Sequence, residues 1–254
     1  MIELQNVSKY YVSKEAGEKA AVRNINLKIE CGELFVLVGE SGSGKTTLLK
    51  MLNGLIEKDS GEIVIAGKNS RDYNRRQLRL NMGYVLQQIA LFPNMNVAEN
   101  IALIPELKGW DKKRIRHRTL ELLERVQLPP SYLKRKPSEL SGGEQQRIGI
   151  LRAIIAEPQI ILMDEPFSAL DPLSRLELQN LIKQIHSDFA TTIVFVTHNV
   201  EEALKLGDRI AVMKGGMLQQ VGAPNTILQQ PENEYVQRFF GTADSAVTNN
   251  RAAI

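Results

Sequence analysis

Residues 39–47 combine glycines, hydroxyl side chains and one lysine in an order that suits the binding of phosphate groups. Glycines let the backbone turn its N–H groups around an anion, and the ammonium of Lys45 adds a full charge near terminal phosphates. The hydroxyl of Thr46 can ligate Mg²⁺. We therefore predict a site for the phosphates of a nucleotide, formed by Gly39, Glu40, Ser41, Gly42, Ser43, Gly44, Lys45, Thr46 and Thr47.

The residues on either side of this loop predict the elements that hold it. Four apolar residues, Phe35 to Val38, lead into Gly39 as a short strand, and apolar residues at helical spacing follow from Leu48 to Leu52. Strand, glycine-rich loop and helix together form the context of a P-loop, in which the helix N-terminus also attracts phosphate. A flexible turn that happens to contain a lysine would not explain this context.

Two adjacent carboxylates follow a second apolar strand, Ile160 to Met163. A P-loop ATPase needs an acid at a strand end to hold Mg²⁺, and a base to orient or deprotonate the attacking water. Asp164 suits the first role and Glu165 the second. The alternative is a pair of solvated acids at the end of a buried strand, and the upstream P-loop favours the catalytic interpretation.

The octapeptide Leu140 to Arg147 contains a further anion-binding pattern. Ser141 and Glu144 fit the capping box Ser-x-x-Glu, in which each side chain binds a backbone N–H at the start of a helix. The same helix start, with Gly142 and Gly143, offers free N–H groups to an anion. Both interpretations can hold at once.

These three segments together resemble the P-loop, signature and strand-end acids of ABC-type ATPases, and the resemblance extends over about residues 1–240. It implies that the nucleotide is ATP, bound with Mg²⁺. Gln87 matches the glutamine that reaches Mg²⁺ and water and faces the membrane partner. Asp171, at the end of Ser168 to Asp171, matches the loop that crosses to a second subunit. His198 matches the histidine that contacts the γ-phosphate.

The family pattern leaves some positions open. Tyr11 aligns with the aromatic residue that stacks on adenine, but Tyr10 is a near-equal candidate from spacing. Most relatives have Asp where this chain has Asn199, and many importers have Gln where it has Glu144. Asn caps a helix as well as Asp does, so we expect the helix at 200–206 to form. Neither change removes a phosphate contact.

The order of predicted elements indicates an α/β fold: a P-loop, RecA-like ATPase core with an N-terminal antiparallel β subdomain and an inserted α-helical subdomain at about 97–156. We expect residues 1–240 to form one ABC ATPase domain and 241–254 a flexible tail. The predicted helices are 44–55, 97–108, 111–127, 142–156, 172–188, 200–206, 224–230 and 232–240. The predicted strands include 2–38 in part, 61–67, 82–86, 160–163, 192–196 and a hairpin over 209–221.

Bulk properties of the 254-residue chain suit an ordinary soluble fold, with 43% hydrophobic and 24% charged residues. The single cysteine, Cys31, excludes an internal disulfide framework. No apolar run reaches the roughly 18 residues that a membrane helix needs, and the N-terminus lacks a signal peptide pattern. The net charge of +3 is too small to argue for nucleic acid.

The resemblance also implies partners. Two copies of the chain would sandwich ATP, permease subunits would bind them at the cytoplasmic face of the cell membrane, and an extracytoplasmic substrate-binding protein would take part indirectly. Residues 83–115 resemble the osmoprotectant branch of bacterial importers, which carries glycine betaine, carnitine or choline. We do not expect the C-terminal regulatory domain of paired CBS modules that many of these ATPases carry. The alternatives are another importer or an exporter, or a soluble ABC ATPase associated with nucleic acid, which we do not expect.

Overall fold

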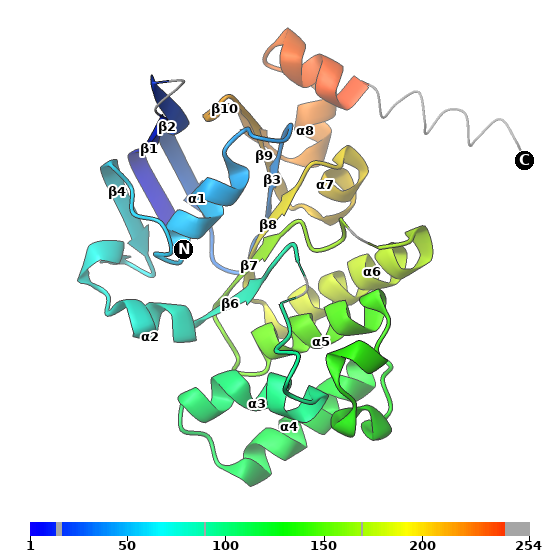
Figure 1. The fold of residues 1–254 in the computed structure, drawn as a ribbon. Coiled ribbons are helices and arrows are strands. Elements are labelled where there is room, and N and C mark those ends of the chain that lie inside the picture. The colour runs from blue at the N-terminus through cyan, green and yellow to red at the C-terminus, as the bar shows by residue number, and fades with distance from the viewer. Residues whose placement is uncertain (14–16, 89, 169, 242–254) are drawn as a thin grey trace, which may run out of the picture. The chain divides into compact units, whose positions relative to one another are not determined.

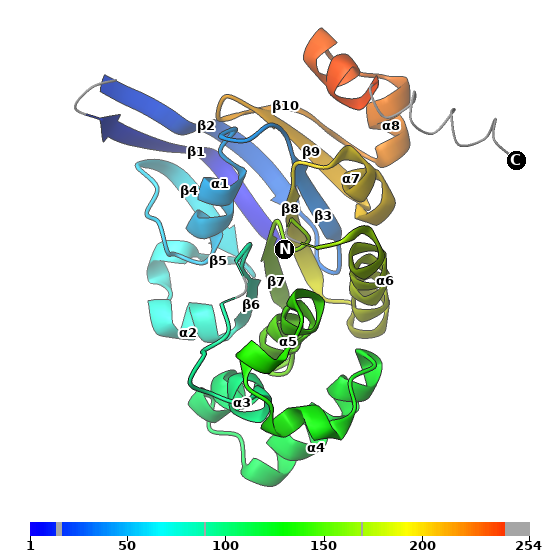
Figure 2. The ribbon, with the colours of Figure 1, turned by 45° about the vertical axis from the view of Figure 1, so that its right-hand side comes forward.

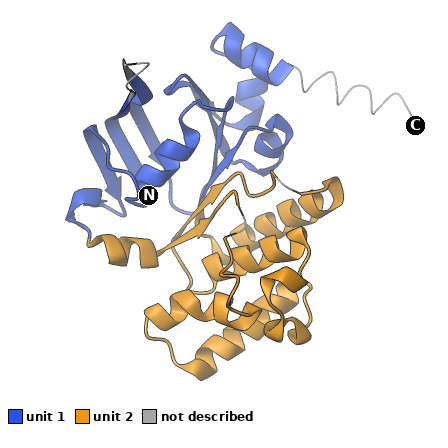
Figure 3. Ribbon diagram, viewed as in Figure 1, with its two compact units in different colours: residues 1–73, 194–254 blue, residues 74–193 orange. Residues whose placement is uncertain are grey.

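The computed structural model describes residues 1–13, 17–88, 90–168 and 170–241. The chain forms two compact units (Figure 3). The first contains residues 1–73 and the chain from residue 194 onward, and the second contains residues 74–193. Within the described part of the chain, no helix combines the length and apolar character needed to cross a bilayer.

The first unit opens with an antiparallel sheet in the strand order β2-β1-β4-β5. Its long β1–β2 ribbon is plain in Figure 2. Apolar residues on one face of these strands are buried, which explains their period-two pattern. The strands are β1 (Ile2–Ser13), β2 (Gly17–Ile29), β4 (Ser60–Ile65) and β5 (Lys68–Asn69).

A second layer of the first unit has the strand order β10-β9-β3-β8, and β3 pairs with β9 in parallel. Every residue of β3 and β8 is buried, so both strands read as continuous apolar runs rather than alternating ones. The strands are β3 (Leu34–Val38), β8 (Thr192–Thr197, which begins in the second unit), β9 (Arg209–Lys214) and β10 (Met217–Gly222). The helices are α1 (Lys45–Leu52), a 3₁₀ turn at Ser70–Asp72, α7 (Val200–Leu206), α8 (Pro224–Gln229) and residues 234–241.

The second unit is mostly helical (Figure 1). Its two strands, β6 (Met82–Val85) and β7 (Ile160–Asp164), pair in parallel, and α5 packs on β6. Helix α3 contacts both α4 and α5. The helices are α2 (Arg75–Leu80), α3 (Val97–Leu107), α4 (Lys112–Arg125), α5 (Gly142–Ile154) and α6 (Pro172–Phe189), with 3₁₀ turns at Pro130–Lys134 and Pro137–Glu139.

These elements confirm the predicted fold class. The predicted helices end within three residues of the observed ones, and β9 and β10 form the hairpin predicted over 209–221, with Gly215 and Gly216 between them. Helix α2 was not predicted: it buries only Leu78, and it lacks the Pro at the first turn that marks the start of the equally short α8. Of the predicted tail, residues 242–254 lie outside the described residues, and the domain boundaries at 97–156 and 1–240 stay predictions.

Candidate nucleotide site

Helix α1 begins without a side chain to cap its N-terminus. Its N-cap residue is Gly44, and its first turn contains no acidic residue. The other α-helices longer than six residues begin with an Asn, Asp or Ser whose side chain accepts a backbone hydrogen bond. The first N–H groups of an α-helix have no acceptor within the helix, so the start of α1 is open to an external anion.

Close packing explains why glycine stands at the last turn of this loop. Gly44 has φ 102°, and a Cβ at this position would lie 2.2 Å from the carbonyl oxygen of Ala21 on β2. Both the backbone conformation and the contact therefore require glycine. The predicted phosphate loop is thus held against the antiparallel sheet of its own unit.

Lys45 lies inside the loop, with only 4% of its surface exposed. Its Nζ donates hydrogen bonds to the carbonyl oxygens of Gly39 (2.7 Å) and Glu40 (2.8 Å). A buried ammonium needs such partners, and a phosphate would offer a stronger, charged one. Thr46 and Thr47 follow in the first turn of α1 and are half-buried. The donors and the charge of this loop fit a phosphate.

The predicted catalytic carboxylates lie in the second unit. Asp164 ends β7 and is only 3% exposed. Burial raises the pKa of Tyr84 on β6, and the negative charge of Asp164 adds to this rise. The phenol hydroxyl of Tyr84 is itself buried and has no hydrogen-bond partner in the described structure. The charge of Asp164 therefore acts in a water-poor environment.

Glu165 has a backbone conformation that few residues other than glycine adopt. Its φ is 42°, in the left-handed region, which costs about 1–3 kcal/mol and recurs at functional sites. Its Oε2 accepts a hydrogen bond from Nε2 of Gln87 at 3.3 Å. The tertiary structure thus brings together two residues that the sequence analysis assigned separately, although 78 positions separate them.

The acids of the site suit Mg²⁺ only if phosphates complete its coordination. No group of three or more His, Cys, Asp or Glu side chains in the described residues could hold a metal by itself. Mg²⁺ binds proteins through one or two carboxylates together with substrate phosphates and water. The buried carboxylate of Asp164 and the amide of Gln87 fit this kind of site.

Helix α5 begins with the predicted capping box. Ser141 Oγ accepts a bond from the Glu144 N–H (3.3 Å), and Glu144 Oε2 accepts one from the Ser141 N–H (2.7 Å). The other carboxylate oxygen of Glu144 accepts a hydrogen bond from the hydroxyl of Tyr132 at 2.6 Å. This bond is the largest of the effects that lower the pKa of Glu144. No sequence signal pointed to Tyr132.

The signature glycines lie near the start of α6. A Cβ at Gly143 would come within 3.1 Å of Ser174 Oγ. Asp171 caps α6, with Oδ1 accepting bonds from the N–H groups of Leu173 (3.1 Å) and Ser174 (3.0 Å). Asp171 is thus the N-cap of α6, and the structure brings the Gly143 and Asp171 segments close together. Ala169, within Ser168 to Asp171, lies outside the described residues.

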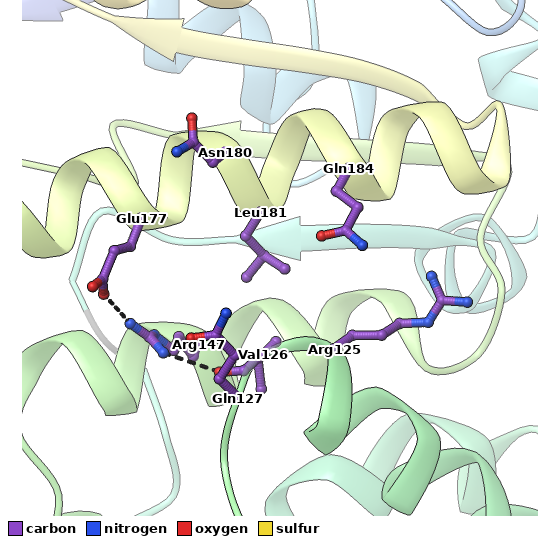
Figure 4. Close-up of a pocket in the computed structure, with 8 residues that line it drawn as sticks. All are labelled: Arg125, Val126, Gln127, Arg147, Glu177, Asn180, Leu181 and Gln184. Atoms are coloured by element: carbon purple, nitrogen blue, oxygen red, sulfur yellow. Dashed lines mark hydrogen bonds and ion pairs between the residues drawn. The ribbon is translucent and has the colours of Figure 1, made fainter.

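Arg147 joins the signature helix to two other helices (Figure 4). Its guanidinium donates to the carbonyl oxygen of Val126 at 3.0 Å, just beyond the end of α4, and forms an ion pair with Glu177 on α6. Carbonyl oxygens at a helix C-terminus lack N–H donors within the helix, so this hydrogen bond satisfies one of them. These residues line a cavity of about 180 Å³. Arg147 belongs to the octapeptide, but no sequence signal predicted its role.

His198 follows β8 directly and is exposed. The next residue, Asn199, caps α7 by accepting a hydrogen bond from the Glu202 N–H at 3.1 Å. The prediction that Asn would preserve this helix is confirmed.

Tyr11 lies on β1 with 45% of its surface exposed, and the Nζ of Lys9 is 5.6 Å from its ring centroid. Tyr10 is half-buried, and its backbone N–H donates to Asp59 Oδ2 at 2.6 Å. The exposed ring of Tyr11 is open to stacking, but the choice between the two tyrosines stays a prediction.

Similar proteins share both sequence and fold with this chain. It is 51% identical to the choline transport ATP-binding protein OpuBA of Bacillus subtilis over 95% of its own length and 62% of that protein. It is 46% identical to the glycine betaine uptake system ATP-binding protein YehX of Escherichia coli, over 97% of the chain and 79% of that protein. The chain thus spans less than two thirds of the length of OpuBA.

Solved structures and a family model agree with these relatives. The dimeric ATP-binding cassette MJ0796, in a post-hydrolysis state bound to ADP and Pi, is 34% identical over 88% of this chain and 99% of that chain, with a TM-score of 0.80. The ABC transporter family model matches residues 22–168, which include the phosphate loop, the signature and the strand-end acids. The chain therefore belongs to the ABC transporter family.

Proposed function

We propose that this chain is the ATP-binding and ATP-hydrolysing subunit of a bacterial importer. The observation that carries the proposal is the placement of Glu165, which is strained at the end of a buried strand and bonded to Gln87. A base must be oriented toward the water that it activates, and both features restrict its orientation. The phosphate loop supplies the binding part, through the buried Lys45 and the open N-terminus of α1.

In this proposal the site residues share the tasks of binding and hydrolysis. Lys45 exchanges its loop carbonyls for the terminal phosphates of ATP, and Glu165 accepts a proton from the attacking water while Gln87 orients that water. Asp164, Gln87 and Thr46 would hold Mg²⁺, which supplies charge neutralisation at the phosphates. His198 would contact the γ-phosphate, and Tyr11 would stack on adenine.

The remaining site residues belong to a dimer in this proposal. The helix start at Ser141, Gly142, Gly143 and Glu144, with Asp171 beside it, would face the nucleotide of a second copy. The similarity to the MJ0796 cassette, which is dimeric, supports this arrangement. Closing around ATP and opening after hydrolysis would then drive the membrane subunits between two states.

We propose a permease as the membrane partner and a quaternary amine as the cargo. OpuBA is named for choline transport and YehX for glycine betaine uptake, which supports this class of cargo. An open groove of about 370 Å³ between α3 and α4 has apolar walls that include Ala98, Ala102 and Ile115, and would receive a permease segment. With such a partner the chain would lie at the cytoplasmic face of the membrane, and a substrate-binding protein would be an indirect partner.

The nucleic-acid alternative gains no support from the basic helix α4. The guanidinium carbon of Arg114 lies 3.5 Å from the centroid of the Trp110 ring, and a guanidinium nitrogen of Arg118 lies 2.8 Å from Glu121 Oε1. Both cations are therefore engaged within the chain. We propose that nucleic acid is not a partner.

The test of hydrolysis compares Glu165→Gln with the unsubstituted protein. We expect the variant to bind Mg·ATP with similar affinity, to lose at least about 100-fold in turnover and to accumulate as a dimer, measured by calorimetry, phosphate release and gel filtration. Glu201→Gln makes the same chemical change at an exposed glutamate of α7 and should behave like the unsubstituted protein. Undiminished hydrolysis by Glu165→Gln would refute the assigned base.

The cargo is tested by uptake. Cells that express the chain with its permease and binding protein should take up labelled choline, glycine betaine or carnitine, and Lys45→Ala should abolish this uptake. Uptake of an unrelated solute alone would remove the cargo proposal and leave the ATPase proposal intact.

A further inference from the structure

The carboxylate of Glu144 stands where an anion can compete with a phosphate. Glu144 lies in the first turn of α5, and the N–H groups of that turn have no acceptor within the helix. The positive end of a helix attracts carboxylates and phosphates alike. In the proposed dimer this helix start faces the nucleotide of a second copy, so the carboxylate must be held elsewhere for a phosphate to bind there.

Two hydrogen bonds fix the carboxylate of Glu144. Its Oε2 accepts the Ser141 N–H at 2.7 Å, and its Oε1 accepts the hydroxyl of Tyr132 at 2.6 Å. The Ser141 hydroxyl in turn accepts the Glu144 N–H. The capping box therefore does not use the N–H groups of Gly142 and Gly143.

Tyr132 can hold the carboxylate because its own position is fixed. It lies on the 3₁₀ turn Pro130–Lys134, which contacts α3, and it is half-buried. Its carbonyl oxygen accepts the Arg135 N–H at 2.9 Å, and the guanidinium carbon of Arg135 lies 3.9 Å from the centroid of its ring. The carbonyl oxygen of Arg135 accepts the Val97 N–H at the start of α3, also at 2.9 Å. The tyrosine is thus anchored through this turn to α3.

The side chain of Glu144 stays charged in this arrangement. The hydrogen bond from Tyr132 is the main cause that lowers the pKa of Glu144, the Ser141 N–H lowers it further, and the positive charge of Arg135 contributes less. A lowered pKa keeps the carboxylate anionic at neutral pH. If it were released from Tyr132, this anion would compete with a phosphate for the N–H groups of the helix start.

We propose that Tyr132 is a positioning residue for the start of α5. Its hydroxyl holds the Glu144 carboxylate away from the free N–H groups of the first turn, so that they stay available to the nucleotide of a second copy. The inference rests on the proposed function, because the start of α5 faces a nucleotide only in the proposed dimer. Tyr132 contacts no phosphate in this dimer and acts only through Glu144.

The test is Tyr132→Phe in the full Glu165→Gln chain, which we expect to form a dimer with Mg·ATP. The dimer dissociation constant is measured at saturating Mg·ATP by analytical ultracentrifugation. One charge at a helix N-terminus changes an equilibrium roughly threefold, and a two-fold dimer contains two such sites, so this constant should rise about tenfold. Mg·ADP should bind the monomer with unchanged affinity, because its phosphate loop is unaltered, whereas general damage to the fold would weaken both.

Glu144→Gln shows whether Tyr132 acts through the carboxylate. A neutral amide carries no charge to compete with a phosphate, so adding Tyr132→Phe to Glu144→Gln should change the dimer dissociation constant by less than about twofold. Tyr73→Phe is the matched control. Its hydroxyl donates to the carbonyl oxygen of Ile65 at 2.8 Å, so this variant also loses a hydrogen bond but leaves the capping box intact. It should dimerise like the parent Glu165→Gln chain.

Three results would overturn the inference. The first is equal dimerisation of Tyr132→Phe and its parent chain. The second is the same rise in the dissociation constant with Glu144→Gln as without it, and the third is a parallel loss of Mg·ADP affinity. If the Glu165→Gln chain forms no dimer with Mg·ATP, the proposed dimer is itself wrong, and this outcome is recognised before any Tyr132 variant is compared.

Discussion

Gly83 on β6 offers a sharp test of how tightly the second unit is packed. Its backbone is ordinary strand, but a Cβ would lie 2.6 Å from the carbonyl oxygen of Ala153 on α5 and 3.3 Å from Ile161 Cγ1. Ordinary contacts begin at 3.4 Å, so Gly83→Ala must move α5 away from β6 by nearly 1 Å. A backbone oxygen cannot rotate aside as a side chain would.

Overpacking of this kind typically lowers the free energy of unfolding by about 1–3 kcal/mol. Ala also reduces the conformational entropy of the unfolded chain, which raises the free energy of unfolding by about 0.4–1 kcal/mol. For a chain of this size, each kcal/mol lowers the thermal midpoint by about 2–4 °C. We therefore expect Gly83→Ala to melt several degrees earlier, as measured by calorimetry. ATP turnover should also fall, because β6 leads to Gln87 and α5 begins at the signature.

Gly149 on α5 supplies the control for this substitution. A Cβ there meets no atom within 4 Å. Gly149→Ala should leave the midpoint unchanged or raise it, since Ala is favoured over Gly in a helix by up to about 1 kcal/mol. If Gly83→Ala proves as stable as the unsubstituted protein, the packing of α5 on β6 described above is wrong.

Variants at two further positions test the helix caps. Asn199→Ala should lower the free energy of unfolding by about 1 kcal/mol, because it removes the acceptor of the Glu202 N–H. Asn199→Asp keeps an acceptor and should keep the stability. Equal thermal midpoints for the two variants would contradict this role of Asn199. The hydrogen bond from the Ser174 side chain is the main cause that lowers the pKa of Asp171, and backbone N–H groups lower it further. The charge of Asp171 therefore stabilises the fold at pH values above the unfolded pKa of about 3.9. This contribution is lost as pH falls through the lower pKa of the folded state. The stability advantage over Asp171→Asn should therefore shrink below about pH 4, and a difference that stays constant from pH 3 to 7 would exclude the charge as its source.

The local features of this protein could be predicted from sequence because each depends on neighbouring residues. The phosphate loop is nine consecutive residues between a strand and a helix, and its order alone fixes which groups face an anion. The caps at Ser141, Asp171 and Asn199 bind N–H groups two or three positions away. Helix α2 was missed because its neighbouring residues carry neither an apolar periodicity nor a Pro at the first turn.

Contacts between distant segments were decided only by the tertiary structure. The hydrogen bond from Gln87 to Glu165, the left-handed backbone of Glu165 and the ion pair of Arg147 with Glu177 arise where separate elements meet. No local pattern specifies such pairs, because they depend on how strands and helices pack over the whole unit. The sequence by itself determined the candidate groups for binding phosphate and activating water. Packing decided which of them meet and which residues hold them in place.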